Sequence, residues 1–342
     1  MGVNLSGLAE PRCAEYEELR GKRVAVDTYN IVYQFMSAIR QPDGFPLCDG
    51  SGRTTSHLTG LLHRSAGLAE AGIEPIFVFD GKPHPLKQAV LDERRERREK
   101  AEREWREAIE RGDLGAARTK AQQTSRMTDE VKKSARELIG YLGFPIADAP
   151  SDGEQEAAYI CRRGGAWAAA SQDYDSLLFG APVLLRNLTL SGRRKVPGKD
   201  VYREIKTEVI DSSAFLDSLG ITREQLVDMC ILMGTDFNAG IKGIGPKKAL
   251  KLVRENGRLE NILPKIGEEI PDYDEIRAIF LDCEGSDDYS PECRPVDRKG
   301  AVDMLTSYDF SADRVNSALD RIEAARAEQE RKRKQRSLDS WF

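Results

Sequence analysis

The chain has 342 residues, of which 40% are hydrophobic, enough to bury a sizeable core in one large domain or two intimate ones. No apolar run reaches 18 residues and the N-terminus lacks a charged and then apolar pattern, so the sequence predicts neither a membrane span nor a signal peptide. The net charge of −5 is unevenly spread, because residues 82–136 carry 16 Lys and Arg against 11 Asp and Glu. Six scattered cysteines without a CxxC pair, and three histidines that do not cluster with them, argue against zinc and for reduced, cytosolic-type thiols.

The first 80 residues alternate between strand and helix patterns. Apolar runs at 24–26 and 76–79 predict strands, and the stretch after the first run predicts a helix. A second helix is expected to begin near residues 54–56, where Thr and Ser form a good N-cap, and to end at Gly72. Between the two helices, turn sequences within 41–52 predict a hairpin.

The segment 85–125 is highly charged and helix-forming, broken by the sequence GDLG at 112–115. It lacks a wide apolar stripe, so we expect it to project from the body. A core helix at 131–142 follows, and strand patterns recur near 166–170 and 182–185. Strands that alternate with helices predict βαβ units and a largely parallel sheet.

The last third of the chain has mainly helical patterns. A capping box at 222–225 opens an apolar helix that ends near Gly234, and the sequence GIKGIGPKKAL follows at 240–250. Its glycines permit a tight turn, and its proline suits the first turn of the next helix. Backbone N–H groups there, with Lys247 and Lys248, could hold a DNA phosphate without reading sequence. The alternative is an ordinary turn between two helices.

Seven carboxylates are the most informative feature of the chain. Asp27 and Asp80 each come at the end of a predicted strand, and Asp173 and Asp175 follow the run at 168–170. The carboxyl ends of strands in an open parallel sheet lie along one edge, where ligands bind. The full set is Asp27, Asp80, Asp152, Glu154, Asp173, Asp175 and Asp236.

Carboxylates gathered at one edge would repel one another strongly unless a cation lay between them. Oxygen ligands favour hard cations such as Mg²⁺ or Mn²⁺. The basic segment 82–136 beside such an acidic pocket suits a polyanion that metal ions cut, which predicts a two-metal phosphodiesterase. On composition alone, a solvated helix with many i,i+4 ion pairs explains that segment equally well.

Five motifs then occur in an order that points to a family. They are VD at 26–27, FVFDGKP at 77–83, APSDGE at 149–154, DYD at 173–175 and MGTD at 233–236. With the glycine hairpin at 240–250, they resemble the flap endonucleases, structure-specific 5′ nucleases of DNA replication and repair. The resemblance runs from Gly2 to Phe342, and the chain stops right after its aromatic tail, as in the short archaeal form.

The resemblance implies two Mg²⁺ ions per active site, for which Mn²⁺ is a candidate substitute. One ion would be held by Asp27, Asp80 and Glu154. The second would be held or oriented by Asp173, Asp175 and Asp236, in part through water. Asp152 stands where the family usually has Glu, so its shorter side chain is expected to reach a metal ion only through water. Glu156 is one helical turn away and could compensate, but a surface position is predicted for it.

By the same resemblance, Lys87 and Arg94 are catalytic residues at the base of a helical arch through which the 5′ flap threads. Their spacing of two helical turns puts both on one face, where cations would stabilise the pentacovalent phosphate. Tyr33 matches a residue that stacks on a base near the cut. Gly2 matches a small residue beside the active site, which argues against the myristoylation pattern that the N-terminus also fits. The implied DNA contacts are Gly2, Tyr33, Gly243, Gly245, Lys247 and Lys248.

The last eight residues, QRSLDSWF at 335–342, fit the clamp-binding peptide pattern of Gln, two spacers, an aliphatic residue, two spacers and two aromatics. One turn of 3₁₀ helix would bring the aliphatic and aromatic side chains onto one face. A sliding clamp of the PCNA type is then the expected partner, bound through Gln335, Leu338, Trp341 and Phe342. The alternative is that the aromatics fold back onto the core of the protein itself.

We therefore expect an α/β protein with a mostly parallel, twisted central sheet flanked by helices, a helical arch and a DNA-binding region of the helix-hairpin-helix type. The expected single nuclease domain comprises an N-terminal nuclease region (1–84), the arch (85–127), an internal nuclease region (128–260) with the hairpin motif at about 222–255, a C-terminal helical region (261–330) and the clamp-binding tail (335–342).

The predicted function is that of a Mg²⁺-dependent 5′ flap endonuclease and 5′–3′ exonuclease, acting as a cytoplasmic, nucleoid-associated monomer on branched DNA. One alternative is a related 5′ nuclease acting mainly on gaps, bubbles or RNA, although the short arch favours flaps over bubbles. Another is a non-catalytic, clamp-tethered DNA-junction binder, against which the intact carboxylates argue.

Overall fold

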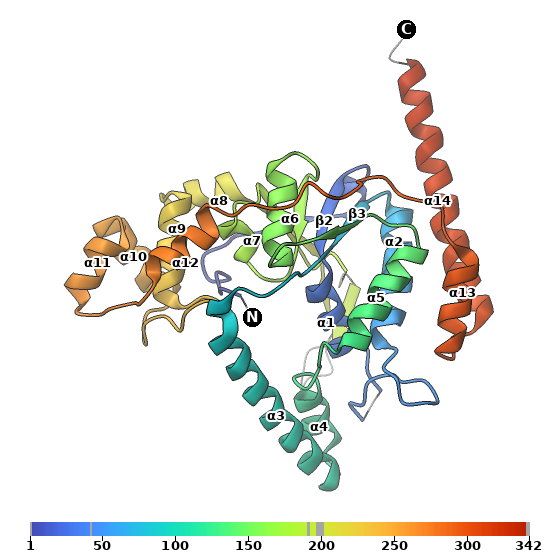
Figure 1. Ribbon diagram of the computed structural model, residues 1–342, viewed down its shortest axis with the longest axis horizontal. Helices are drawn as coiled ribbons and strands as arrows, with labels where there is room; N and C mark the ends of the chain where they lie inside the picture. The colour runs from blue at the N-terminus through green and yellow to red at the C-terminus, as the bar shows by residue number, and fades with distance from the viewer. Residues whose placement is uncertain (1, 42, 190–191, 196–201, 340–342) are drawn as a thin grey trace.

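The computed structural model describes residues 2–41, 43–189, 192–195 and 202–339 (Figure 1). Within them, a seven-stranded sheet has the order β1-β9-β6-β5-β2-β3-β4. Its strands are β1 (Arg12–Ala14), β2 (Arg23–Asp27), β3 (Glu74–Phe79), β4 (Ile146–Asp148), β5 (Ala168–Ala170), β6 (Val183–Arg186) and β9 (Thr207–Asp211). A small second sheet pairs β7 (Gly192–Lys195) with β8 (Tyr202–Ile205).

The strands that carry the predicted carboxylates are parallel and adjacent. β2 pairs with both β3 and β5, so that Val26 lies opposite Phe77 on one side and Ala170 on the other. This register brings the carboxyl ends of the three strands to the same edge of the sheet. β9 is antiparallel to β1 and β6, so the expectation of a mostly parallel sheet is confirmed, with an antiparallel end that the sequence did not reveal.

Alternate strand residues face opposite sides of the sheet, and each side has its own core. Ala25, Ile76 and Val78 pack on one side with α6 (Gly153–Arg162), α7 (Asp175–Leu178) and α9 (Arg223–Met233). Val24, Val26 and Phe77 pack on the other side with α1 (Thr28–Ala38), α2 (Ser56–Ala71) and α5 (Asp129–Tyr141). α13 (Arg298–Ser307) and α14 (Ala312–Asp339) form a further layer outside α5 and α2 (Figure 1).

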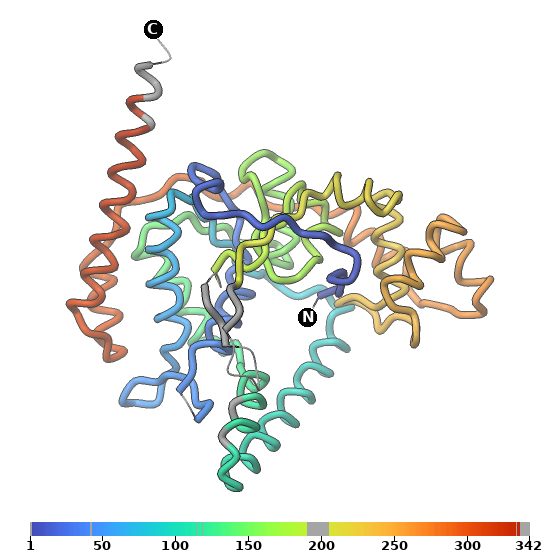
Figure 2. The backbone as a smooth tube through the Cα atoms, turned by 180° about the vertical axis from the view of Figure 1, so that it is seen from behind, coloured from blue at the N-terminus to red at the C-terminus, as the bar shows by residue number. Residues whose placement is uncertain are grey.

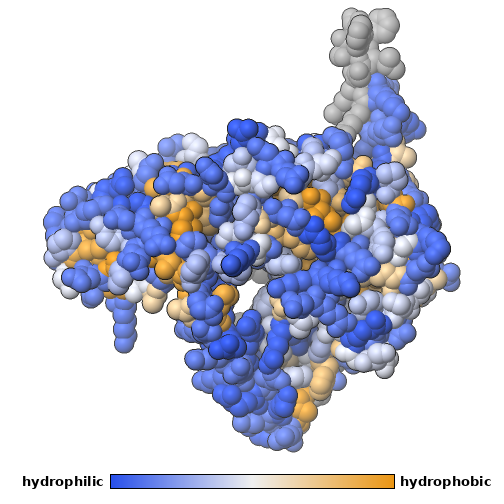
Figure 3. All heavy atoms as spheres, viewed as in Figure 1, coloured by the Kyte–Doolittle hydropathy of each residue, from blue (hydrophilic) through white to orange (hydrophobic). Residues whose placement is uncertain are grey.

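The charged segment forms an arch that projects from the body, as expected. It begins with a short 3₁₀ turn, η2 (Pro85–Lys87), which leads into α3 (Gln88–Glu110), and α4 (Leu114–Ala121) returns beside it (Figures 1 and 2). The two helices pack on each other through small side chains, namely Ala101, Ala108, Ala117 and Ala121. The face of the arch seen in Figure 3 is largely hydrophilic, in keeping with its lack of a wide apolar stripe.

The predicted capping box at the start of α9 is present, because Thr222 and Gln225 exchange side-chain and backbone hydrogen bonds. The turn after α9 leads into α10 (Pro246–Asn256), whose first residue is the predicted proline. The remaining helices on this side are α8 (Ser212–Leu219), α11 (Leu259–Ile266) and α12 (Tyr273–Leu281). None of the helices in the described residues is both long and apolar enough for a membrane span.

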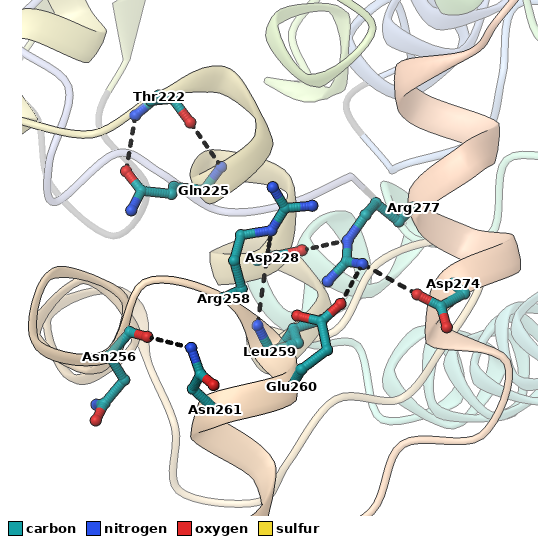
Figure 4. Close-up of polar contacts among 10 residues, drawn as sticks. All are labelled: Thr222, Gln225, Asp228, Asn256, Arg258, Leu259, Glu260, Asn261, Asp274 and Arg277. Carbon is teal, nitrogen blue, oxygen red and sulfur yellow. Dashed lines mark hydrogen bonds and ion pairs between the residues drawn. The ribbon is translucent and has the colours of Figure 1, made fainter.

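A buried ion-pair network holds α9, α11 and α12 together (Figure 4). Asp228 of α9 is fully buried and accepts a hydrogen bond of 2.7 Å from Arg277 Nε of α12. The same arginine also donates to Glu260 of α11 at 2.7 Å, and the backbone N–H of Leu259 donates to Asp228 at 3.3 Å. A buried carboxylate without such partners would be strongly destabilising, so the network fixes how the helices after the turn sit on α9.

Candidate active site

The predicted carboxylates meet at the carboxyl edge of the sheet. Asp27 ends β2 and caps α1, where its side chain accepts the N–H of Asn30 at 3.0 Å. Asp80 follows β3 and accepts the N–H of Gly153, in the first turn of α6, at 2.8 Å. A Cβ atom on Gly153 would lie 2.6 Å from Asp80 Oδ1, so the glycine allows this close approach.

The start of α6 brings two further carboxylates to the same edge. Glu154 accepts a hydrogen bond of 2.5 Å from the hydroxyl of Ser171, which follows β5. Asp152 lies at the N-cap position, but its side chain makes no capping bond. Its Oδ1 lies 2.6 Å from Lys87 Nζ, and its Oδ2 is buried without a hydrogen-bond partner in the described part of the chain.

The loop after β5 supplies Asp173 and Asp175. Asp173 accepts a hydrogen bond of 3.1 Å from the side-chain amide of Asn30. Asp175 is buried and accepts the N–H of Val3 at 2.7 Å. A Cβ atom on Gly2 would lie 2.5 Å from Asp175 Oδ2, so the N-terminal segment lies directly against this carboxylate. Gly2 therefore lies next to Asp175, and its contact with DNA stays a prediction.

Two cationic side chains at the base of the arch form ion pairs with carboxylates of the cluster. Arg94 Nη2 lies 2.5 Å from Asp236 Oδ1, in the turn after α9. Lys87 Nζ lies 2.6 Å from Asp152 and 3.8 Å from Asp236, and 5.1 Å from the centre of the Phe237 ring. Both cations thus lie within 4 Å of Asp236, Lys87 from the end of η2 and Arg94 from α3.

Several carboxylates of the cluster are buried close to one another, and this raises their pKa values. Burial and the neighbouring Asp80 raise the pKa of Asp27 well above its usual value. Burial, together with nearby carboxylates, raises the pKa of Asp80 to about 6 and that of Asp175 to about 7. The pKa of Glu154 is raised for the same two reasons. Burial lowers the pKa of Lys87, but the attraction of Asp152 and Asp236 outweighs burial and leaves its pKa above the usual value.

The donor set fits hard divalent cations. All seven predicted ligands are carboxylates, several are buried against one another, and Asp152 has an oxygen without a partner. In the described residues, no group of three or more Asp, Glu, His or Cys side chains is already arranged to hold an ion. The carboxylates are instead turned toward protein donors, such as the N–H of Val3 and the side chains of Lys87 and Arg94.

The predicted DNA-binding turn lies between α9 and α10. Gly243 has a left-handed backbone with φ of 82°, which the turn requires, and Gly245 is the N-cap of α10. Lys247 and Lys248 are both exposed in the first turn of that helix. Gly240, the first glycine of the predicted turn, is sterically essential, because a Cβ there would lie 2.2 Å from the backbone N of Gly234.

Tyr33 and the predicted clamp-binding tail do not belong to the carboxylate cluster or to the DNA-binding turn. Tyr33 of α1 is 37% exposed, one of only two large hydrophobic residues in the described chain that are so exposed, which suits a stacking role. Gln335 is exposed on α14, a helix that continues through Leu338 to Asp339 (Figure 1). Trp341 and Phe342, the aromatic pair of the predicted clamp-binding tail, lie outside the described residues.

The expectation of a surface position for Glu156 was wrong. Its side chain is fully buried, and its Oε2 accepts the N–H of Ser286 at 2.9 Å. It faces the segment between α12 and α13 and holds that segment against α6. Sequence reasoning also missed Asn30 and Ser171, which orient Asp173 and Glu154, because nothing local marks a hydrogen bond between residues so far apart in the chain.

Known protein families match two parts of the chain, and curated relatives match its whole length. The XPG N-terminal domain family matches residues 1–101, and the XPG I-region family matches residues 143–236. Flap endonuclease 1 of Staphylothermus marinus is 47% identical over 350 residues, covering 100% of both chains. Flap endonuclease 1 of Archaeoglobus fulgidus is 45% identical, again over 100% of both chains.

Two solved structures are similar to this chain over most of its length. Flap endonuclease-1 from Methanococcus jannaschii has a TM-score of 0.77 and 37% identity, covering 96% of this chain and 100% of that one. The catalytic core of Rad2 in complex with DNA substrate shares the fold, with a TM-score of 0.67 and 23% identity, covering 91% of this chain and 96% of that one. This chain belongs to the flap endonuclease family.

Proposed function

We propose that this protein is a structure-specific 5′ flap endonuclease and 5′–3′ exonuclease of DNA replication and repair, working as a monomer. The observation that carries the proposal is the meeting of Lys87 and Arg94, from the arch, with Asp152 and Asp236, at the carboxylate cluster. Cations on a projecting arch and carboxylates on a sheet edge together form a site for a phosphodiester between them. Residues 1–84, 85–127, 128–260 and 261–330 would then be regions of one nuclease domain.

The proposed substrate is branched DNA with a 5′ flap. The relatives are named flap endonucleases, the Rad2 catalytic core has been solved with DNA substrate, and human GEN1 has been solved with Holliday junction DNA. In this chain, the turn at 240–250 would bind duplex phosphate through the backbone N–H groups at the start of α10 and through Lys247 and Lys248. Such contacts position the duplex without reading its sequence, which suits recognition of DNA shape.

Two divalent cations, Mg²⁺ or Mn²⁺, are the proposed cofactors. Asp27, Asp80 and Glu154 would hold one of them, and Asp173, Asp175 and Asp236 would hold or orient the other. Bound there, the ions would polarise the phosphate and activate a water molecule for attack. Asp152 is proposed to act through water, because its side chain is one methylene shorter than the Glu that the family usually has there.

The remaining roles belong to side chains of the chain itself. Lys87 and Arg94 would leave Asp152 and Asp236 to stabilise the charge that builds up on the phosphate during cleavage. Tyr33, exposed on α1, would stack on a base next to the cut and hold the strand in place. Gly2 and Val3 would close the far side of the site, with the N–H of Val3 fixing Asp175.

Cleavage of a 5′-flap oligonucleotide with Mg²⁺ and with EDTA tests the proposal. We expect cleavage at the flap base with Mg²⁺ alone, and its collapse in Asp80→Ala and Asp175→Ala with flap binding largely kept. Asp217→Ala, which removes an exposed carboxylate of α8, is the matched control and should cleave normally. Cleavage within about tenfold of wild type in either active-site variant would contradict the metal assignment. Faster cleavage of gaps, bubbles or RNA would favour the related-nuclease alternative, and binding without cleavage would favour the junction binder.

The arch cations have their own test. Lys87→Ala and Arg94→Ala should each slow single-turnover cleavage about a hundredfold, or roughly 3 kcal/mol, because a transition-state contact is lost. The dissociation constant for the flap should change far less. A weaker affinity with an unchanged rate would mean that the two residues only grip the flap.

A sliding clamp of the PCNA type is the proposed protein partner, bound through residues 335–342. α14 carries the start of this segment away from the body, which would leave it accessible (Figure 1). Deleting 335–342 should leave cleavage of free flaps nearly intact but abolish stimulation by the clamp. Undiminished stimulation, or unfolding of the truncated protein, would contradict this proposal.

A further inference from the structure

The arch is attached to the body at a second place, far from the active site. The segment between α1 and α2 forms the predicted hairpin, in which Arg40 bridges to Pro46 and Cys48 to Thr54. Phe45 of this hairpin is 44% exposed to solvent, yet the centre of its ring lies 4.7 Å from that of Trp105 on α3, at an interplanar angle of 65°. This edge-on geometry is favourable for aromatic pairs and adds about 0.5–1.5 kcal/mol beyond the apolar area that they bury. The outer half of α3 is therefore joined to the hairpin by one aromatic contact.

The returning limb of the arch is joined to the same hairpin. Arg40 donates to the hydroxyl of Ser125 at 2.8 Å, and Ser37 Oγ lies 3.2 Å from the same oxygen. Arg40 also donates to the carbonyls of Met36 and Gly44, at 2.9 and 2.8 Å. The guanidinium of Arg40 thus connects α1, the hairpin and the segment after α4. These hydrogen bonds hold the hairpin that carries Phe45 in position.

The arch has little else to hold it in position. Among the described residues, α3 packs mainly on α4, and neither helix makes an extensive contact with any other named helix or strand except η2 at the base of the arch. At that base, Lys87 and Arg94 pair with carboxylates of the body, Lys87 also faces the ring of Phe237, and Leu86 packs against the core. The orientation of α3 therefore depends on the base of the arch near residues 86–94, on the aromatic contact at residue 105 and, through α4, on the hydrogen bond between Arg40 and Ser125.

We propose that Phe45 and Trp105 form a latch that positions the arch, and through it the side chains of Lys87 and Arg94, before DNA binds. Neither latch residue would touch the reacting phosphate, so both are positioning residues. The inference rests on the proposed function for its catalytic part only, because the latch itself is a contact in the DNA-free protein.

The geometry of a rigid helix explains why so distant a contact matters. With a rise of about 1.5 Å per residue, Trp105 lies about 26 Å and Arg94 about 9 Å from the start of α3. A swing of about 10° around that start would move the indole by roughly 4–5 Å and Arg94 by roughly 1.5 Å. A misplacement of about 1 Å can cost a hundredfold in rate, so fixing the indole keeps Arg94 within working distance.

The first experiment observes the latch without DNA or catalysis. In a Trp167→Phe/Trp341→Phe background, Trp105 is the single remaining tryptophan of the three in the chain. Phe45→Ala should shift the emission of Trp105 to longer wavelength and increase its quenching by acrylamide. Glu110→Ala, an exposed position at the end of the same helix, is the matched control and should change neither. Unchanged emission in Phe45→Ala would overturn the latch.

The second experiment tests the positioning role by single-turnover cleavage of a 5′ flap with Mg²⁺. Phe45→Ala should lower the rate about tenfold to a hundredfold and change the dissociation constant less than about twofold. In a Lys87→Ala/Arg94→Ala background, the same substitution should cost less than about twofold, since no arch cations remain to be positioned. An equal loss in both backgrounds would mean that Phe45 acts by another route and would overturn the proposal.

A conservative variant separates positioning from general loss of structure. The indole N–H of Trp105 is buried without a hydrogen-bond partner in the described residues, so Trp105→Phe keeps the ring contact and removes an unpaired donor. It should cleave at a rate close to wild type, whereas Trp105→Ala should behave like Phe45→Ala. Equal defects in the two Trp105 variants would contradict the latch. If wild type cleaves no flap at all, the proposed function fails, while the fluorescence result still decides whether the latch exists.

Discussion

Replacing Asp175 with Asn should stabilise the protein in the absence of divalent ions while abolishing cleavage. The side chain is only 4% exposed, and burial together with Asp236 and Asp173 raises its pKa from 3.8 to about 7. An amide of the same shape removes the charge. It can still accept the N–H of Val3, which now donates to Asp175 Oδ1 at 2.7 Å.

The sign and size of the effect follow from proton binding. The folded protein holds the Asp175 proton up to about pH 7, whereas the unfolded chain releases it near pH 4. The free energy of unfolding therefore falls as the pH rises from about 4 to about 7, and stays low above that. A difference of about three pKa units corresponds to about 4 kcal/mol at most, so Asp175→Asn should recover up to that amount at pH 8.

Urea unfolding in EDTA, at pH 5 and at pH 8, measures this prediction. The gain in Asp175→Asn should be large at pH 8 and less than half as large at pH 5. Mg²⁺ should then stabilise wild type more than the variant, because an ion that binds only the folded state adds stability by mass action. Asp217→Asn, at an exposed position, is the control and should show neither effect.

Two results would refute the reasoning. If Asp175→Asn were no more stable than wild type at pH 8, the carboxylates would not repel one another as their burial implies. A gain that is the same at both pH values would mean that the substitution acts through packing rather than through charge. Either result would remove the main physical argument for cations at this edge of the sheet.

Three further predictions follow from single side chains. Gly2→Val should reduce cleavage strongly, measured at saturating Mg²⁺, because its Cβ would lie 2.5 Å from Asp175 Oδ2; normal activity would contradict the close approach. Asp152→Glu should be tolerated or shift the optimal metal concentration, and Asp152→Ala should slow cleavage less than Asp175→Ala; an equal collapse would make Asp152 a direct ligand. Burial lowers the pKa of His57 from 6.5 to about 4, so below pH 6.5 the unfolded chain binds a proton that the folded protein does not. The free energy of unfolding of wild type should therefore fall by about 3 kcal/mol between pH 6.5 and pH 4. Unfolding of His57→Gln, measured across the same range, should lack this fall.

The sequence alone predicted the elements whose patterns are local. The apolar spacing of α5, the capping box of α9, the proline that opens α10 and the left-handed Gly72 after α2 depend on residues within a few positions of one another. The carboxylates at the ends of β2 and β3 were predictable for a related reason, since parallel strands share an edge. The family resemblance added their grouping, and the roles of the individual residues remain predictions.

The tertiary structure decided what depends on long-range contacts. The short strands β1 and β9 carry too little periodicity to predict. β9 joins the sheet by pairing with β6, and β1 joins it by pairing with β9. The pairing of Asp152 with Lys87, the burial of Glu156 and the contact of Phe45 with Trp105 each join residues at least 60 positions apart. No local pattern marks such partners, because a side chain's burial, pKa and neighbours are set by whichever distant segment the folded chain brings against it.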